Sequence, residues 1–186
     1  ETDKENLFLT PIASLRYSPN KGLNKRDQKT FIGYKDLFNL DRIDGKTVEE
    51  GAAVTLGLEY KNQNKLNDID NFNFGLGVNL RLDEDEDIPL STSLNKKTSD
   101  IIGYSGLNIS ENLSINYNFS IDQNLSETNY SLVSADYSGN KFKTSFEYME
   151  KSNFIGDESY FKNITEIKLN NSNLIAFETN KNIDKN

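Results

Sequence analysis

The alternation of large apolar residues with small or polar ones, repeated along the whole chain, restricts the fold more than any other feature. From Phe72 to Leu82 every second residue is large and apolar, and the residues between them are Asn, Gly and Arg. Residues 113–121 repeat this pattern with only Ser and Asn on the second face. A period of two is typical of β-strands whose two faces differ, and no stretch has a convincing helical period. The sequence therefore predicts an all-β, antiparallel protein.

Looser versions of the same pattern recur along the chain, and we expect nine or ten strands. The least regular is the stretch at residues 30–34. The segments with alternation are residues 12–17, 30–34, 54–60, 72–82, 113–121, 133–137, 142–148, 161–169 and 175–177.

The connections between these strands alternate in length. Residues 110–112, 138–140 and 170–173 are short and rich in Asn, Ser and Gly, as tight turns are, whereas residues 83–100, 122–129 and 150–159 are longer and polar. Short turns at one rim and long loops at the other are typical of an up-and-down outer-membrane barrel. Alternation alone is also found in soluble β-sandwiches, so that class stays open.

Strand length and aromatic placement favour the barrel. The best strands keep a small or polar second face over 9 to 11 residues, close to the length that crosses a bilayer at a tilt. Aromatic residues lie towards strand ends at Tyr60, Phe72, Tyr137 and Tyr148, as in the girdles of membrane barrels. No apolar run is long enough for a membrane-spanning helix.

Composition excludes several classes of function. The chain has no cysteine and no histidine, so thiol nucleophiles, serine–histidine triads and His or Cys metal sites cannot be built from it. Its 21 basic and 29 acidic residues give a net charge of -8, which opposes binding to nucleic-acid phosphates. We expect no enzyme active site, no cofactor and no nucleic-acid partner.

One acidic run could in principle bind a cation. Residues 83–87 are five consecutive Asp and Glu residues, and carboxylates are the ligands that hard divalent cations prefer. Adjacent acids point to alternate sides and lack the spacing of a calcium loop. We therefore favour a solvated loop over a calcium or magnesium site.

Several stretches, in order along the chain, carry a resemblance to a known family. They include residues 11–20, the segment Asp36-Leu37-Phe38-Asn39-Leu40-Asp41-Arg42-Ile43, the acidic-glycine step at residues 49–51 and the strand at residues 53–60. Residues 112–124, 141–150 and 153–158 look like later hairpins of the same barrel. Together these stretches resemble the C-terminal barrel domain of the LptD family of lipopolysaccharide-assembly proteins.

The resemblance implies a large transmembrane β-barrel in the outer membrane of a Gram-negative cell, which inserts lipopolysaccharide into the outer leaflet without covalent chemistry. It implies four partners: lipopolysaccharide, a plug lipoprotein, periplasmic bridge proteins and outer-membrane lipid. Residues 1–186 are expected to be part of the barrel domain, without the N-terminal periplasmic domain and the closing strands that form the family's lateral seam. The alternatives are another outer-membrane channel, such as a porin-like one, and a soluble secreted β-sandwich that binds a ligand.

The polar face of the two best strands supplies the candidate site. Within it, Gly75 and Gly77 would let another backbone or a bulky side chain approach the sheet. The other residues of this face either lie near passing head groups and the plug lipoprotein or merely hydrate a polar interior. The candidates for facing the barrel lumen are Asn73, Asn79, Arg81, Ser114, Asn116 and Asn118.

Overall fold

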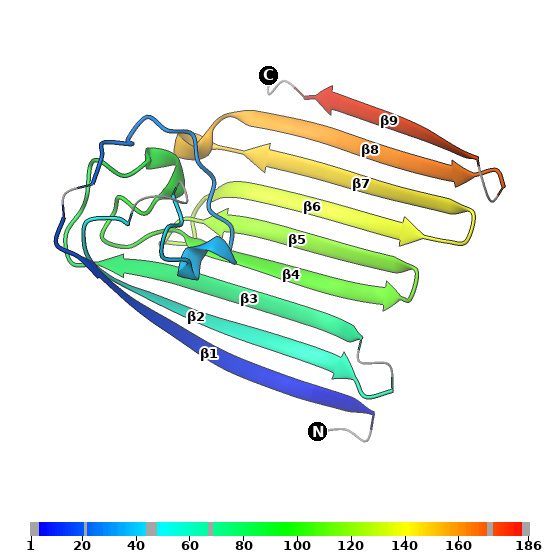
Figure 1. Cartoon of the computed structure of the whole chain (residues 1–186), viewed down its shortest axis with the longest axis horizontal. Coiled ribbons are helices and arrows are strands. Elements are labelled where there is room, and N and C mark those ends of the chain that lie inside the picture. Colours follow the sequence, from blue (N-terminus) through cyan, green and yellow to red (C-terminus); the bar gives the residue numbers. More distant parts are fainter. Residues whose placement is uncertain (1–3, 21, 44–47, 67–68, 171–172, 184–186) are drawn as a thin grey trace.

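The computed structural model describes residues 4–20, 22–43, 48–66, 69–170 and 173–183. Nine antiparallel strands form one sheet within these ranges, and each strand pairs with its neighbours in the sequence (Figure 1). The edge strands β1 and β9 do not pair with each other, so the sheet is open. No helix in the described ranges is long and apolar enough to cross a membrane. The elements are β1 (Glu5–Ser18), η1 (Asp36–Phe38), β2 (Gly51–Asn64), β3 (Asp70–Arg81), η2 (Leu90–Thr92), β4 (Ile101–Ser110), β5 (Leu113–Ile121), β6 (Thr128–Ser138), β7 (Phe142–Lys151), η3 (Asn153–Ile155), β8 (Glu158–Lys168) and β9 (Leu174–Asn182).

The predicted all-β, up-and-down architecture is confirmed, and so is the alternation in length of the connections. Tight turns join β4 to β5 and β6 to β7 at one end of the sheet, where β8 and β9 are also connected, and the longer loops lie at the opposite end (Figure 1). The two longest connections, residues 19–50 and 82–100, share this loop end. We call them the first loop and the second loop.

The pairing of the strands sorts the side chains onto two unlike faces. In the β2–β3 pair, Val54 lies opposite Leu80 and Leu56 opposite Val78, whereas Thr55 lies opposite Asn79. Because side chains alternate across a strand, a slip of one residue would exchange the two faces completely. We call the face that carries Val54 and Leu56 the outer face, and the face that carries Thr55 and Asn79 the inner face.

The outer face is largely apolar, with polar side chains such as Asn163 and Thr144 on the later strands, and nothing in the described structure covers it. Leu15 is 80% exposed and Phe177 is 57% exposed, although both lie within strands. Soluble monomers rarely expose one contiguous apolar surface of this extent. Exposed apolar residues on this face are Leu7, Leu9, Leu15, Tyr17, Val54, Leu56, Leu80, Leu107, Ile109, Val133, Tyr137, Phe142, Phe146, Tyr148, Ile167, Ile175 and Phe177.

The two long loops fold back onto the inner face and form a small hydrophobic core there. Leu37 of the first loop and Leu94 of the second are fully buried in it. Burying one leucine side chain stabilises a fold by about 1.5–3 kcal/mol, so this core helps to hold both loops against the sheet. Its buried members are Ile32, Tyr34, Leu37, Ile43, Ile88, Leu94 and Ile102.

The strand β4 (Ile101–Ser110) was not expected from the sequence, and one expected strand is absent. Residues 30–34 lie in the first loop and form no strand, although Ile32 and Tyr34 alternate with small or exposed neighbours. Both side chains are buried because this part of the loop packs on the inner face, where the ring of Tyr34 lies 5.0 Å from that of Tyr104. A period of two thus arises here from one-sided contact with the inner face, without any pairing of strands.

Candidate functional site

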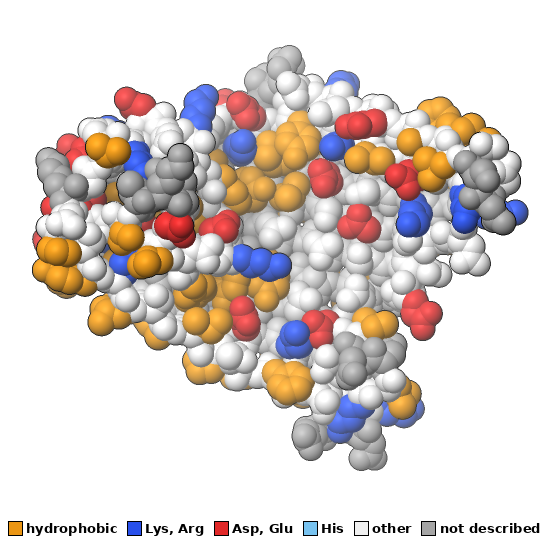
Figure 2. All heavy atoms as spheres, viewed as in Figure 1, with side chains coloured by type: hydrophobic (Ala, Val, Ile, Leu, Met, Phe, Trp, Pro, Cys, Tyr) orange, Lys and Arg blue, Asp and Glu red, His pale blue; other side chains and the backbone are white. Residues whose placement is uncertain are grey.

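The inner face is the polar surface of the sheet, and the loops cover only one end of it. Figure 2 shows this face, with hydrophobic side chains around the loops and scattered acidic and basic side chains over the later strands. On the uncovered part, Lys162 of β8 forms an ion pair of 3.4 Å with Glu178 of β9. The inner face is therefore divided into a sealed region under the loops and an open, charged region.

Glycines in the floor of the sealed region allow the loops to come close to the sheet. A Cβ atom at Gly77 would lie 2.8 Å from Cδ2 of Leu37, a distance that real Cβ atoms essentially never show. Phe38 lies over Gly57 in the same way, and the ring of Tyr104 lies over Gly75. The expectation that Gly75 and Gly77 admit bulky side chains is confirmed.

A buried group of charged residues ties the first loop to the sheet. Arg42 of the loop donates to both carboxylate oxygens of Glu49, through Nε and, at 2.7 Å, through Nη2. Arg81 of β3 donates to the same carboxylate at 3.1 Å. Both Arg42 and Glu49 are almost fully buried. Burial of a carboxylate is tolerated only when it is paired and hydrogen-bonded in this way.

Neutral polar groups complete this arrangement. Arg42 donates at 3.0 Å to Oδ1 of Asn79, which also accepts from the Thr55 hydroxyl at 3.1 Å.

Arg16 of β1 is 4% exposed and donates to the carbonyl of Asn39, while its Nε and Nη1 have no hydrogen-bond partner among the described residues. We call Arg16, Arg42, Glu49, Arg81 and Asn79 the anchor cluster.

A second buried group joins the end of the second loop to the middle strands. Asp100 accepts from the Ser120 hydroxyl at 2.9 Å and from Asn129 at 2.7 Å. Asn153, in η3, donates to Oδ1 of Asn129 at 2.7 Å. The loop end is thus held at two places by side-chain hydrogen bonds.

Next to the sealed region lies an open groove of about 610 Å³. Its walls combine aromatic rings, amides and charges, with Lys61 paired to Asp70 at 3.0 Å. A smaller cavity of about 340 Å³ shares Lys61 and Tyr104 with it and continues towards Phe8 and Glu59. We call the larger cavity the inner groove; its residues are Gly33, Tyr34, Lys35, Asp36, Lys61, Asp70, Asn73, Tyr104, Ser105, Asn116, Asn118 and Ser134.

The chemistry of the inner groove suits a hydroxyl-rich ligand. The rings of Tyr34 and Tyr104 lie 5.0 Å apart at its edge, and side-chain amides line its floor. Burial raises the pKa of the Tyr34 phenol, and the carboxylate of Glu59 adds to the rise. Tyr34 is therefore a neutral phenol at any physiological pH, and the groove offers neutral donors and acceptors beside apolar ring faces.

The six candidate residues from the sequence divide between these regions. Asn79 and Arg81 are buried beneath the loops, at 0% and 8% exposure. Asn73, Asn116 and Asn118 line the inner groove. Ser114 lies on the inner face opposite Asp136, beyond the groove and closer to the turn end.

Comparison with known proteins decides the family. The family model described as LptD, LPS transport system D, matches residues 3–177. The chain belongs to the LptD family. A search of the curated proteins finds no significant match.

LptD proteins are outer-membrane components of lipopolysaccharide transport, which is not an enzymatic role. The open nine-stranded sheet of this LptD chain agrees with a piece of barrel wall. Its apolar outer and polar inner faces are those of a membrane barrel, which alternates lipid-facing and lumen-facing residues along each strand.

The acidic run at residues 83–87 is partly engaged by the loops of this LptD chain. Asp85 is 3.4 Å from Arg81, and Asp87 accepts from the amide of Asn24 at 2.7 Å. Among the described residues no three acidic side chains are grouped to hold a metal ion. The run thus joins the two loops to each other and to the anchor cluster, which its sequence alone does not indicate.

Sequence reasoning missed most of the anchor cluster. The sequence places Arg42 and Glu49 only in stretches that resemble the family, and Arg16 in such a stretch that is also an expected strand. A signal was present, because Arg16 and Arg81 occupy the small, polar face of their strands where an unpaired charge would be costly. Their partner Glu49 lies in a loop whose inward fold has no periodic signature.

Proposed function

We propose that this chain forms part of the wall of an outer-membrane translocon that assembles lipopolysaccharide into the outer leaflet, and that the inner groove lies along the path of the sugar head group. Transport of this kind needs no covalent chemistry. In this proposal residues 1–186 are one part of the C-terminal barrel domain.

The difference between the two faces of the sheet is the observation that carries the proposal. A largely apolar outer face is stable only against lipid, whereas the inner face presents amides, hydroxyls and paired charges to water or to a polar ligand. A soluble β-sandwich would bury one apolar face against a second sheet. The described residues form a single sheet whose apolar face is uncovered.

The inner groove supports transport of a carbohydrate-bearing lipid over the alternative of a general channel for small ions. Carbohydrates present both hydroxyl groups and apolar ring faces, so amides such as Asn116 and Asn118 and rings such as Tyr34 match them. The nearby charged pair Lys61–Asp70 adds polar contacts without a large net charge. A porin-like channel for small ions would have no need of the aromatic edge.

The partners of the translocon belong to the same proposal. The uncovered, charged inner face of β6–β9 is a surface on which a plug lipoprotein would pack, and the turn end is the end that would face the periplasmic bridge proteins. The two loops would then lie towards the cell exterior. In that position the loops would cover the inner face of the wall at its outer end.

A site-specific cross-linking experiment tests the proposal in the intact protein in living Gram-negative cells. A photoreactive residue at Asn118 would face the groove, and one at Ile115 would face the opposite side of the same strand, nearer the turn end and so the inner leaflet. We expect lipopolysaccharide adducts at Asn118 and phospholipid adducts at Ile115. Lipopolysaccharide adducts of equal yield at both positions, or at neither, would contradict the proposed path.

A further inference from the structure

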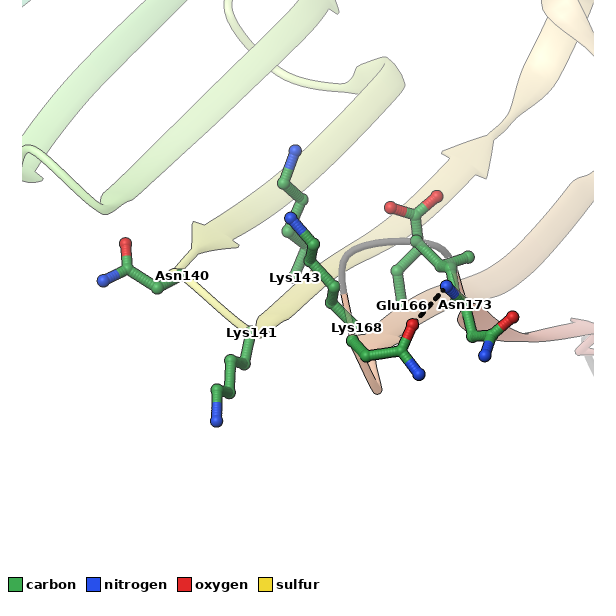
Figure 3. A pocket seen from close by; sticks show the side chains of 9 residues that line it. Asn140, Lys141, Lys143, Glu166, Lys168 and Asn173 are labelled. Atoms are coloured by element: carbon green, nitrogen blue, oxygen red, sulfur yellow. Dashed lines mark hydrogen bonds between the residues drawn. The ribbon is translucent and has the colours of Figure 1, made fainter.

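A basic pocket lies at the turn end of the sheet, apart from the inner groove and the anchor cluster. It has a volume of about 350 Å³ and lies between the β6–β7 turn and the connection of β8 to β9 (Figure 3). Three lysines and one acidic residue, Glu166, belong to its described lining. We call it the rim pocket; its residues are Gly139, Asn140, Lys141, Lys143, Glu166, Lys168, Asn170, Asn173 and Leu174.

The register of the strands places the rim pocket on the inner face. Lys143 lies opposite Glu166 in the β7–β8 pair, and Lys168 lies opposite Leu174 in the β8–β9 pair. Along β7, Lys143 has the same parity as Glu147, which lies opposite a residue of the inner groove, Ser134. Side chains of equal parity share one face of a strand. A ligand of the rim pocket would therefore lie on the lumen side of the barrel wall, as a ligand of the inner groove would.

The lysines of the rim pocket are unpaired, unlike the other strand lysines of the inner face. Lys141, Lys143 and Lys168 are exposed, and none forms an ion pair with the residues that the structure describes, although Glu166 faces Lys143. The ion pairs elsewhere on this face are Lys61–Asp70 at 3.0 Å, Lys151–Glu158 at 3.5 Å and Lys162–Glu178 at 3.4 Å. The rim pocket thus has an excess of positive charge in a chain whose net charge is -8.

Hydrogen bonds hold the backbone of the rim pocket in place. The N–H of Lys168 donates to the carbonyl of Lys141 at 2.8 Å and so joins the two hairpins. The N–H of Asn173 donates to the side chain of Asn170 at 2.9 Å. In Figure 3 the side chains of Lys143 and Lys168 extend to one side, whereas that of Lys141 extends to the other. Lys143 and Lys168 are therefore the two cations that one anionic group could contact together.

The chemistry of the rim pocket suits a phosphate carried by a sugar. A phosphate monoester has a charge of about -1.5 to -2 at pH 7, which two lysine ammonium groups can balance. The amides of Asn140 and Asn173 also belong to the lining, as does the apolar side chain of Leu174. Sugars present hydroxyl groups that bond to amides and ring faces that pack on apolar groups, so these residues match the part of the ligand beyond its phosphate.

From this arrangement we propose that the rim pocket binds a phosphate group on the sugar head group of the cargo, on the inner face at the turn end. Lys143 and Lys168 donate charge-assisted hydrogen bonds to the phosphate oxygens, and the asparagine amides bind the sugar. The inference rests on the proposed function in taking lipopolysaccharide as the cargo and the inner face as its path. Because the turn end would face the periplasm, the head group would meet the rim pocket before it reaches the inner groove.

The test measures the binding of water-soluble probes to the intact protein in uncharged detergent by isothermal titration calorimetry. The probes are fully deacylated lipopolysaccharide, the same oligosaccharide after removal of its phosphates, and inorganic phosphate. The pocket variant is Lys143→Gln/Lys168→Gln. The control variant Lys151→Gln/Lys162→Gln also removes one inner-face lysine from β7 and one from β8, but both of these lie outside the rim pocket and are paired with acids.

We expect saturable binding of the phosphorylated oligosaccharide that becomes roughly tenfold weaker in the pocket variant and changes by less than about twofold in the control. Removal of the phosphates should weaken binding to the unmodified protein to a similar extent and have little further effect in the pocket variant. Glu166→Gln removes an acid from the lining and should strengthen binding of the phosphorylated probe.

Three results would overturn the inference. An affinity that stays the same in the pocket variant, or falls equally in both variants, would refute the site. Equal binding of the dephosphorylated oligosaccharide would refute the assignment to a phosphate, and equal binding of inorganic phosphate would refute the assignment to a sugar phosphate. Lipopolysaccharide cross-links at Asn118 report on the proposed function separately, because that residue lines the inner groove and is not part of the rim pocket.

Discussion

Replacing Glu49 with glutamine tests whether the anchor cluster holds the first loop on the sheet. The substitution keeps the size and shape of the side chain and removes one negative charge. The Glu49 carboxylate accepts hydrogen bonds from Arg42 and, at 3.1 Å, from Arg81. Its side chain is 1% exposed and that of Arg81 is 3% exposed, so water cannot replace the lost charge.

The expected cost follows from the burial of the two guanidinium groups. Removing one partner of a buried ion pair typically costs about 3–5 kcal/mol, because the other charge stays buried and uncompensated. Glutamine can still accept one hydrogen bond, so we expect the lower end, about 3 kcal/mol. At about 1.36 kcal/mol for each factor of ten, the open state of the loop becomes roughly 150-fold more populated.

Hydrogen exchange measured by mass spectrometry on the intact protein in detergent detects this change. Peptides from residues 32–43 should exchange roughly 150-fold faster in Glu49→Gln, while peptides from β6–β9 keep their protection. Glu50→Gln is the matched control, because Glu50 is next to Glu49 and its side chain forms no ion pair with the described residues. Equal exchange of residues 32–43 in both variants would refute the view that buried charge pairing holds the loop.

Three other perturbations test separate parts of the structure. Gly77→Val places side-chain atoms where Leu37 lies. We expect it to lower the free energy that holds the first loop on the sheet by about 1–3 kcal/mol, as measured by limited proteolysis. The backbone N–H of Glu127, helped by the N–H and hydroxyl of Ser126, holds the pKa of the Asp122 carboxyl below its ordinary value. The order that this carboxylate gives the β5–β6 loop should be complete at neutral pH and be lost as the pH falls through the lowered pKa. The exchange of the Ser126 and Glu127 amides relative to their intrinsic rates will show this loss of protection, and in Asp122→Asn that protection should not change over the same pH range. On the outer face, Asn163 donates at 3.0 Å to the Thr144 hydroxyl and accepts from Thr165 at 3.2 Å; Asn163→Ala should cost about 0.6–1.7 kcal/mol in a urea titration in lipid, because polar groups that face lipid depend on one another.

Eight of the nine strands could be predicted from the sequence because their faces differ so completely, whereas β4, whose inner and outer faces both carry small residues such as Gly103, Ser105 and Gly106, was not among the expected strands. Phe72 to Leu82 and residues 113–121 alternate without interruption, and β3 and β5 lie there. The lengths of the connections likewise follow from their composition. Both signals are local, since a strand and a tight turn depend mainly on residues that are adjacent in the sequence.

The inward fold of the loops could not be predicted in the same way. The contact of Leu37 with Gly77 joins residues 40 positions apart, and the contact of Arg42 with Asn79 depends on the same docking. Alternation in the first loop even suggested a strand at residues 30–34. The polar face of β3 indicated where a partner was needed, and only the three-dimensional structure shows that loop residues supply it.

The order of strands in the sheet has a consequence for folding. The strands from β4 to β9 are joined by short turns and by the modest loops 122–127 and 152–157, so each hairpin can form with little loss of chain entropy. The first loop, residues 19–50, is roughly sixteen times longer than the β4–β5 turn, and at about 0.6 kcal/mol for each doubling its closure costs about 2.5 kcal/mol more. Pairing of β1 with β2 should therefore be the late step, completed when the hydrophobic core under the loops and the anchor cluster form. The sheet would then assemble from its β9 side towards β1, and the residues that close the loop end would also complete its folding.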